Sequence, residues 1–314
     1  MENNPKSESI LIHQLRQIIG RSGTTNIPAD TPRDLIDDMA VIEPGQPWLW
    51  TVDTLMDGVD FNSAQHGWYD IGRKAMAANL SDCAAMATRP VSALCALILN
   101  ENLGLDDALN LMRGAHECGL RYACPIGGGD TNSWQAPTAI SITIAARPEA
   151  GRQPVCRDGA RPGDRIYVSG ALGGSILGRH MSFEPRIETA LAINRQLAPT
   201  AMIDISDGLA IDLWRILEAS DCGATIDVAA LDAAVHQDSF ELARRDGQSP
   251  REHALYDGED FELIVALPNS APADICASLG LLLLGQIEPG PGLFLTATDG
   301  QRTPIERRGW EHFR

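Results

Sequence analysis

Hydrophobic and polar residues follow two different periods along this chain of 314 residues. Apolar residues at helical spacing predict helices over residues 8–20, 69–87, 105–118, 233–245 and 271–279. Runs of β-branched and aromatic residues predict strands over 48–55, 91–99, 138–146, 164–170, 202–204, 224–228, 262–267, 281–285 and 293–298. Strands that alternate with helices along the whole chain predict an α/β or α+β protein.

Composition changes between residues 147 and 163, where prolines and glycines gather at Pro148, Gly151, Pro154, Gly159, Pro162 and Gly163. Such residues favour loops and linkers. A length of 314 residues is also typical of two domains. We therefore expect one domain over residues 1–149 and a second over 150–314.

The balance of charge narrows the function further. A net charge of −17 argues against nucleic acid as a partner, because phosphate backbones attract basic surfaces. Lys6 and Lys74 are the two lysines, and the Gly-x-x-x-x-Gly-Lys pattern of a P-loop is absent. If this protein handles a polyphosphate, divalent cations and a few arginines must neutralise it.

Cysteine usage and hydropathy indicate a cytoplasmic protein. The 7 cysteines are scattered and lack a Cys-x-x-Cys pair, which argues against a disulfide framework and against a zinc site. No apolar run approaches the roughly 20 residues that span a membrane. The first residues also lack the apolar region of a signal peptide.

Residues 201–209 carry the first candidate chemistry. They read as an apolar strand that ends at Asp204, followed by a helix that is expected to begin near Ser206 and Asp207. Ser206 is expected to cap this helix, and a helix N-terminus favours phosphate groups. Taken alone, the stretch is equally compatible with ordinary helix capping.

Four further aspartates lie at element ends or among small and apolar residues: Asp38, Asp53, Asp82 and Asp130. Asp53 stands in an apolar strand, where a charge is costly unless something pairs with it. Asp130 follows Gly127–Gly129, a run that can take positive φ angles and present N–H groups to phosphate. An ordinary glycine-rich turn remains the alternative there, as does an Asp-rich turn at Asp38.

Several carboxylates in one cleft would repel one another unless a cation were present. Mg²⁺ is a hard ion that carboxylates, water and substrate phosphates hold, and no His or Cys cluster suits zinc. We therefore expect Mg²⁺-dependent chemistry on a polyphosphate, in which metal ions and positioning do most of the work. The polar residues 21–33 are our candidate for a mobile flap over the site.

A set of motifs, in order along the chain, resembles the thiamine-monophosphate kinase family; they cover residues 37–40, 51–54, 79–82, 128–131, 204–208, 258–263 and 309–313. The resemblance implies an N-terminal mixed sheet with helices that pairs with a second subunit's sheet into a dimeric β-barrel, and a C-terminal α/β domain. It implies phosphorylation of thiamine monophosphate to thiamine diphosphate, with ATP as co-substrate, several Mg²⁺ ions and a homodimer.

The resemblance also implies roles for single residues, by motif position. The implied metal ligands are Asp38, Thr51, Val52, Asp53, Asp82, Asp130, Asp204 and Asp207. The implied ATP contacts are Gly129, Asp130, Arg157 and Ser206, and the implied substrate contacts are Glu259 and Trp310. Transfer is expected to be direct and in line, without a nucleophilic side chain, so that Asp82, Asp130 and Asp207 matter most as metal-bound residues.

Three positions depart from the family pattern. Val52 stands where a hydroxyl residue is usual, and Ile36 replaces a usual Gly. Asp60 stands where a substrate-contacting His is usual, so we place it among the substrate contacts. An acid there would repel a phosphate, which leaves open an ATP-dependent enzyme of the same fold with a different small-molecule acceptor. A non-catalytic scaffold with solvated acids is the third alternative.

Overall fold

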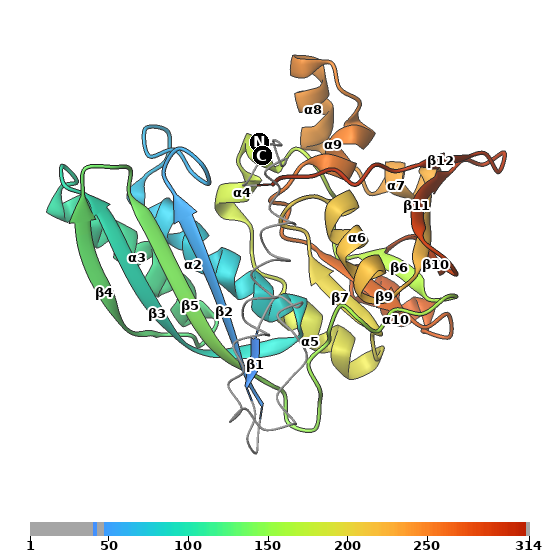
Figure 1. The fold of residues 1–314 in the computed structure, drawn as a ribbon, viewed down its shortest axis with the longest axis horizontal. Helices are drawn as coiled ribbons and strands as arrows, with labels where there is room; N and C mark the ends of the chain where they lie inside the picture. Colours follow the sequence, from blue (N-terminus) through green and yellow to red (C-terminus); the bar gives the residue numbers. More distant parts are fainter. Residues whose placement is uncertain (1–39, 43–46, 312–314) are drawn as a thin grey trace, which may run out of the picture.

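The structure is a computed structural model that describes residues 40–42 and 47–311. The expected helix over 8–20, the expected flap over 21–33 and Asp38 lie outside the described residues. Figure 1 shows two sheets, one on each side of the molecule, with helices packed between and around them. No helix of the described part is long and apolar enough to cross a membrane.

The first sheet, within the described residues, has the strand order β1-β2-β5-β3-β4. Its strands are β1 (Ala40–Ile42), β2 (Trp48–Met56), β3 (Thr88–Asn100), β4 (Ile126–Trp134) and β5 (Ala139–Pro148). β3 and β4 are parallel and the other pairs are antiparallel. Helices α2 (Trp68–Ala85) and α3 (Leu105–Arg121) cover one face of the sheet.

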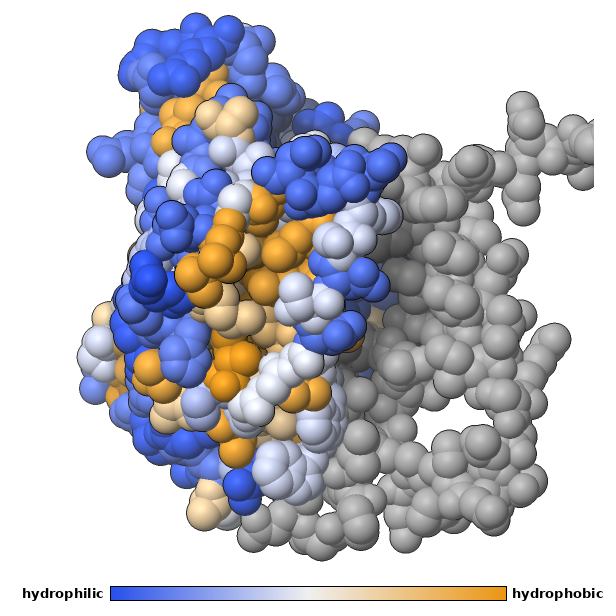
Figure 2. All heavy atoms as spheres, turned by 90° about the vertical axis from the view of Figure 1, so that its left-hand side faces the viewer, coloured by the Kyte–Doolittle hydropathy of each residue, from blue (hydrophilic) through white to orange (hydrophobic). Residues whose placement is uncertain are grey.

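The second face of this sheet carries exposed hydrophobic side chains. Residues of β2 alternate between buried and exposed, as in a strand with one covered face. Val52 is 59% exposed, and it lies in register with Leu94 of β3, which is 50% exposed. Figure 2 shows hydrophobic residues gathered on the side where β4 forms the edge of the sheet in Figure 1. Patches of this kind mark interaction surfaces.

The second sheet, again within the described residues, has the strand order β12-β11-β8-β10-β6-β9-β7. Its strands are β6 (Arg165–Val168), β7 (Ala201–Asp204), β8 (Gly223–Asp227), β9 (Leu263–Leu267), β10 (Leu282–Glu288), β11 (Gly292–Thr296) and β12 (Arg302–Pro304). The accompanying helices are η1 (Ser175–Leu177), α4 (Arg179–Ser182), α5 (Ile187–Gln196), α6 (Leu209–Ala219), α7 (Val228–Ala233), α8 (Gln237–Asp246), α9 (Pro250–Tyr256) and α10 (Ala273–Ser278).

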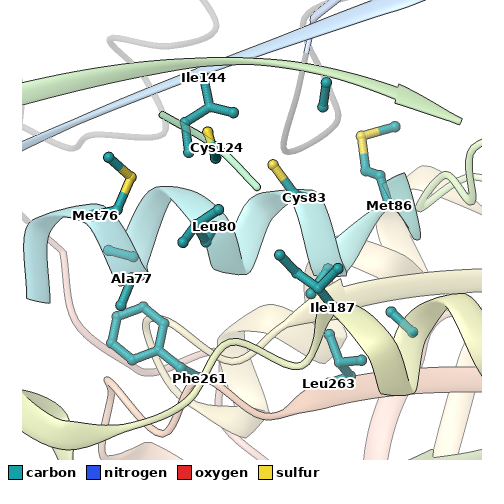
Figure 3. Close-up of a cluster of buried hydrophobic side chains, with 14 of the residues drawn as sticks. Met76, Ala77, Leu80, Cys83, Met86, Cys124, Ile144, Ile187, Phe261 and Leu263 are labelled. Atoms are coloured by element: carbon teal, nitrogen blue, oxygen red, sulfur yellow. The ribbon is translucent and has the colours of Figure 1, made fainter. Parts of the chain in front are cut away.

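Helix α2 is buried along most of its length because both halves of the protein pack against it. Figure 3 shows Ile144 and Cys124 on one side of α2, and Phe261 and Leu263 on the other. Small residues such as Ala77 allow these neighbours to approach closely. The buried residues of α2 include polar ones, Lys74, Asn79 and Ser81, which need partners from the neighbouring elements. As a result, α2 brings residues of both halves to its own C-terminal turns.

The expected boundary near residue 150 falls between β5 and β6. The division into domains over 1–149 and 150–314 stays a prediction. One core cluster includes side chains from both ranges, such as Ile144 and Val265.

Three local expectations were wrong. Gly127–Gly129 form no turn; they belong to β4 and have no positive φ. Glycine is needed at position 129 because a Cβ there would lie 1.8 Å from the Cys95 carbonyl oxygen. Helix α6 begins at Leu209 after Gly208, so Ser206 does not cap it. The helix expected over 233–245 is α8, which starts only at Gln237.

Candidate active site

A pocket of about 570 Å³ lies between elements of the two sheets. Its lining comes from β2, from the turn after β2, from α2, from η1 and from three later loops, and includes Asp53, Asp60, Lys74, Ser206, Asp207, Glu259 and Trp310. A slightly larger cavity of about 610 Å³ lies at Arg89 and Arg147–Gln153 and contains none of the expected site residues. The first pocket is therefore the candidate site.

The C-terminal turns of α2 gather several aspartates that are far apart in sequence. Thr51 Oγ1 on β2 donates a hydrogen bond to the Asp82 carboxylate. The Asp53 backbone N–H donates to Asn79 Oδ1 at 2.9 Å. On the other side of α2, Ser81 Oγ donates to Asp204 Oδ2 at 2.5 Å, and Asp204 is buried. Asp53, Asp82 and Asp204 therefore lie around a single turn of α2.

Asp207 lies in the loop after β7, and three residues outside this loop hold it in place. Asp207 Oδ2 accepts from Arg215 Nη2 at 2.6 Å, and its carbonyl oxygen accepts from the Trp310 N–H at 2.9 Å. The N–H groups of Asp207 and Gly208 donate to Asp212 Oδ2 at 3.0 and 3.1 Å. Asp212 is fully buried, and burial raises its pKa to about 7 although the Arg215 guanidinium opposes the shift. Asp212 thus fixes the backbone that carries Asp207.

The implied substrate contacts line the same pocket. Glu259 pairs with Lys74 at 2.6 Å between Oε1 and Nζ, and burial raises the pKa of the Glu259 carboxyl. Trp310 leaves half of its side chain exposed at the pocket. Asp60 also lines the pocket, and its Oδ2 accepts from the Met56 N–H at 2.8 Å. One carboxylate oxygen of Asp60 therefore stabilises the turn that follows β2.

Among the described residues, seven implied ones are not part of the pocket lining: Thr51, Asp82 and Asp204, which lie at α2, and Val52, Gly129, Asp130 and Arg157. Gly129 and Asp130 are on the edge strand β4, where Asp130 is in register with Ala96, Ser141 and Thr54 across the sheet. Three strand spacings, about 14 Å, separate Asp130 from β2 of the same chain. Arg157 is half-buried, and its carbonyl oxygen accepts from Ser220 Oγ at 2.8 Å, at the end of α6. Val52 points to the open sheet face.

Lys74, Asp212 and Arg215 are site residues that the sequence analysis did not select. Lys74 and Asp212 each stand inside an apolar helix, where a charge is costly unless it is paired. A charged residue at such a position is the sequence signal that could have identified both as site residues. Within residues 47–311, no three His, Cys, Asp or Glu side chains lie close enough together to hold one metal ion.

His180 lies behind the pocket wall at Ser175, whose carbonyl oxygen accepts from its Nδ1 at 3.0 Å. Burial lowers the pKa of His180 to about 4, from an ordinary value of 6.5, and the Lys74 charge adds to the shift. As the pH falls below about 6.5, the unfolded chain takes up this proton first, so stability is lost. We expect the free energy of unfolding to fall by at most about 3 kcal/mol between about pH 6.5 and pH 4 from this group.

Urea unfolding across this pH range checks the expectation. His180→Gln keeps a hydrogen-bond donor but does not titrate, so it should flatten the curve, whereas His116→Gln on α3 should leave it unchanged. An equally steep loss of stability in His180→Gln would contradict the assignment.

Comparison with known proteins agrees with this arrangement. The family model described as AIR synthase related protein, N-terminal domain, matches residues 36–147. The thiamine-monophosphate kinase of Rhodopirellula baltica is 44% identical over 237 residues, which cover 73% of each chain. That of Synechococcus elongatus is 31% identical over 306 residues, which cover 88% of this chain and 90% of the relative.

Solved structures extend the similarity to the fold. The structure named AaThiL complexed with AMPPCP and TMP has a TM-score of 0.83 at 27% identity, and covers 98% of this chain and 97% of its own. Thiamine monophosphate kinase from Aquifex aeolicus has a TM-score of 0.78 at 26% identity, with 93% and 97% covered. With the two curated relatives that match over most of their length, these results show that the chain belongs to the thiamine-monophosphate kinase family.

Proposed function

We propose that this chain phosphorylates thiamine monophosphate to thiamine diphosphate, with ATP as the phosphoryl donor. One observation carries the proposal: Asp53, Ser206, Asp207, Glu259 and Trp310, from elements of both sheets, line a single pocket. A family relative of the same fold is named as a complex with AMPPCP and TMP.

We further propose several Mg²⁺ ions as the metal. The side chains around the last turns of α2 and at the pocket include carboxylates and hydroxyls, the hard oxygen donors that Mg²⁺ prefers. Asp53, Asp82, Asp204 and Asp207 would hold these ions, with Asp38, Thr51, Val52 and Asp130 as the remaining implied ligands. When bound, Mg²⁺ neutralises charge on the phosphates.

The reaction needs no nucleophile from the protein. An oxygen of the acceptor phosphate forms a bond to the γ-phosphorus while the bond to the β,γ-bridging oxygen breaks, and ADP leaves. The acceptor phosphate is already largely ionised near neutral pH, so no general base is required. The chain's residues bind and align the reactants: Asp207, held by Arg215 and Asp212, and Ser206 face the pocket from one loop. Gly129, Asp130 and Arg157 are the other proposed ATP contacts.

Glu259 and Trp310 are proposed to receive the acceptor. The thiazolium ring of thiamine monophosphate is a flat cation, which suits both an aromatic face and a carboxylate. Asp60 favours the second candidate, an enzyme of this fold with another acceptor, since it adds a further acid to the pocket.

Turnover of ATP with thiamine monophosphate, against a panel of phosphorylated metabolites and a no-acceptor control, decides between the two. ADP and thiamine diphosphate should appear in equal amounts. Thiamine monophosphate rates equal to the no-acceptor control would exclude the first function. A phospho-enzyme trapped with ATP alone would exclude direct transfer.

We also propose that the protein is a cytoplasmic homodimer in which two first sheets close into a barrel. The open face with Val52 and Leu94 supports this, as do two unpaired sheet edges. β1 pairs with β2 only at Trp48–Trp50, so the rest of that edge has no strand beside it among the described residues. β4 is the opposite edge. Closure would place β4 of one copy beside β2 of the other.

A further inference from the structure

Lys74 is unusual in this protein. It is one of two lysines, and the other, Lys6, lies outside the described residues. Lys74 stands in the middle of α2 and is only 1% exposed. A buried ammonium group is strongly unfavourable unless charged and polar partners surround it. The partners of Lys74 therefore indicate what it is there to hold.

Both partners belong to loops that line the pocket. Lys74 Nζ donates to the backbone carbonyl oxygen of Asp60, in the turn after β2, and pairs with Glu259 Oε1 at 2.6 Å. Asp60 lies in the turn after β2 of the first sheet, and Glu259 lies in the loop before β9 of the second sheet. A single ammonium on a rigid helix thus joins two pocket walls that are about two hundred residues apart in sequence.

The backbone conformation and the surrounding charges of Glu259 both require a stabilising partner. Its backbone has φ of 62°, in the left-handed region that non-glycine residues rarely occupy, and its N–H donates to the Ser206 carbonyl oxygen at 2.7 Å. Burial and the nearby Asp60 and Asp207 carboxylates raise the pKa of Glu259, whereas Lys74 is the group that opposes them. Without Lys74, a half-buried carboxylate would face two further acids and would lose the ion pair that opposes them.

We propose that Lys74 is a positioning residue for the acceptor: its ammonium holds the Glu259 carboxylate in the pocket and fixes the Asp60 turn opposite. This inference rests on the proposed function, in which Glu259 binds the acceptor. Because the two partners that Lys74 contacts, the Asp60 carbonyl oxygen and the Glu259 carboxylate, are protein groups at the acceptor side of the proposed site, we expect the loss of Lys74 to affect binding of the acceptor selectively.

A double-mutant cycle tests the proposal. Lys74→Met is expected to raise the KM for thiamine monophosphate by about tenfold or more and to leave the KM for ATP within about twofold. In the Glu259→Gln background, Lys74→Met should add clearly less than it does in the wild type, because one of the two groups it positions is already changed. Lys74→Arg, which keeps the charge, should recover part of the loss. The effect of Trp310→Ala on the KM for thiamine monophosphate should instead multiply with that of Lys74→Met, since the proposed ring contact with the acceptor is independent of Lys74.

A folded Lys74→Met protein with an unchanged KM for thiamine monophosphate would overturn the proposal, as would effects that multiply with Glu259→Gln. If Lys74→Met does not fold, Glu259→Gln and the double variant are compared, because the double variant leaves no unpaired buried charge.

Amide hydrogen exchange gives a measurement that needs no acceptor. Residues 256–261 should exchange faster in Lys74→Met than in the wild type, both without ligand, and equal rates would overturn the proposal. This readout separates the two failures: wild-type enzyme that does not turn over thiamine monophosphate contradicts the proposed function, whereas unchanged exchange contradicts the role of Lys74.

Discussion

Asp212→Ala should lower kcat by about 100-fold or more and the free energy of unfolding by about 3 kcal/mol. The fully buried Asp212 carboxylate accepts the N–H groups of Asp207 and Gly208 and pairs with Arg215. Its removal takes the acceptor from two backbone donors and takes one charge partner from the Arg215 guanidinium. The Asp207 loop then loses the geometry that alignment of the phosphates requires.

Steady-state kinetics with ATP and thiamine monophosphate, together with urea unfolding, measure both effects. Asp232→Ala is the matched control, because Asp232 forms an exposed pair with Arg251 at 2.8 Å and should change stability by less than about 1 kcal/mol. Asp212→Asn keeps the shape and one acceptor, so it should retain more stability than Asp212→Ala but still lose activity. Wild-type kcat in a folded Asp212→Ala protein would contradict this account of the loop.

Local sequence signals predicted the strand that ends at Asp204 and the apolar helix α2, because both depend on hydrophobic periodicity within one element. The same signals did not reveal that Gly127–Gly129 lie in a strand. Three consecutive glycines carry no side chains from which a period could be read. Their role depends on Cys95, whose backbone passes too close to Gly129 for any Cβ.

Contacts between distant elements were also beyond the reach of sequence patterns. The ion pair of Lys74 with Glu259 and the hydrogen bond of Ser81 to Asp204 depend on how α2 packs between the two halves. The resemblance to a family supplied residue roles without supplying distances. It therefore gave no warning that Asp130 lies three strands away from β2 in its own chain.

That separation leads to the second large effect. Asp53→Asn and Asp130→Asn should each lower kcat by about 1,000-fold, if both residues serve the phosphates. In the proposed barrel, β4 of one copy lies beside β2 of the other, so Asp130 would complete the pocket of the partner copy. A heterodimer of the two variants would then contain one intact site, built from the unchanged Asp53 of one chain and the unchanged Asp130 of the other.

Mixing the two inactive variants in equal amounts, after unfolding and refolding together, should restore about a quarter of wild-type activity, since half of the dimers are mixed and each has one intact site of two. Asp53→Asn mixed with Asp207→Asn is the matched control: both residues line one chain's own pocket, so no site is repaired. Differently tagged chains confirm that mixed dimers form. If they form and the first mixture stays inactive, Asp130 does not act across the dimer, and the two strands between it and Asp53, β3 and β5, would leave it without a role in this pocket.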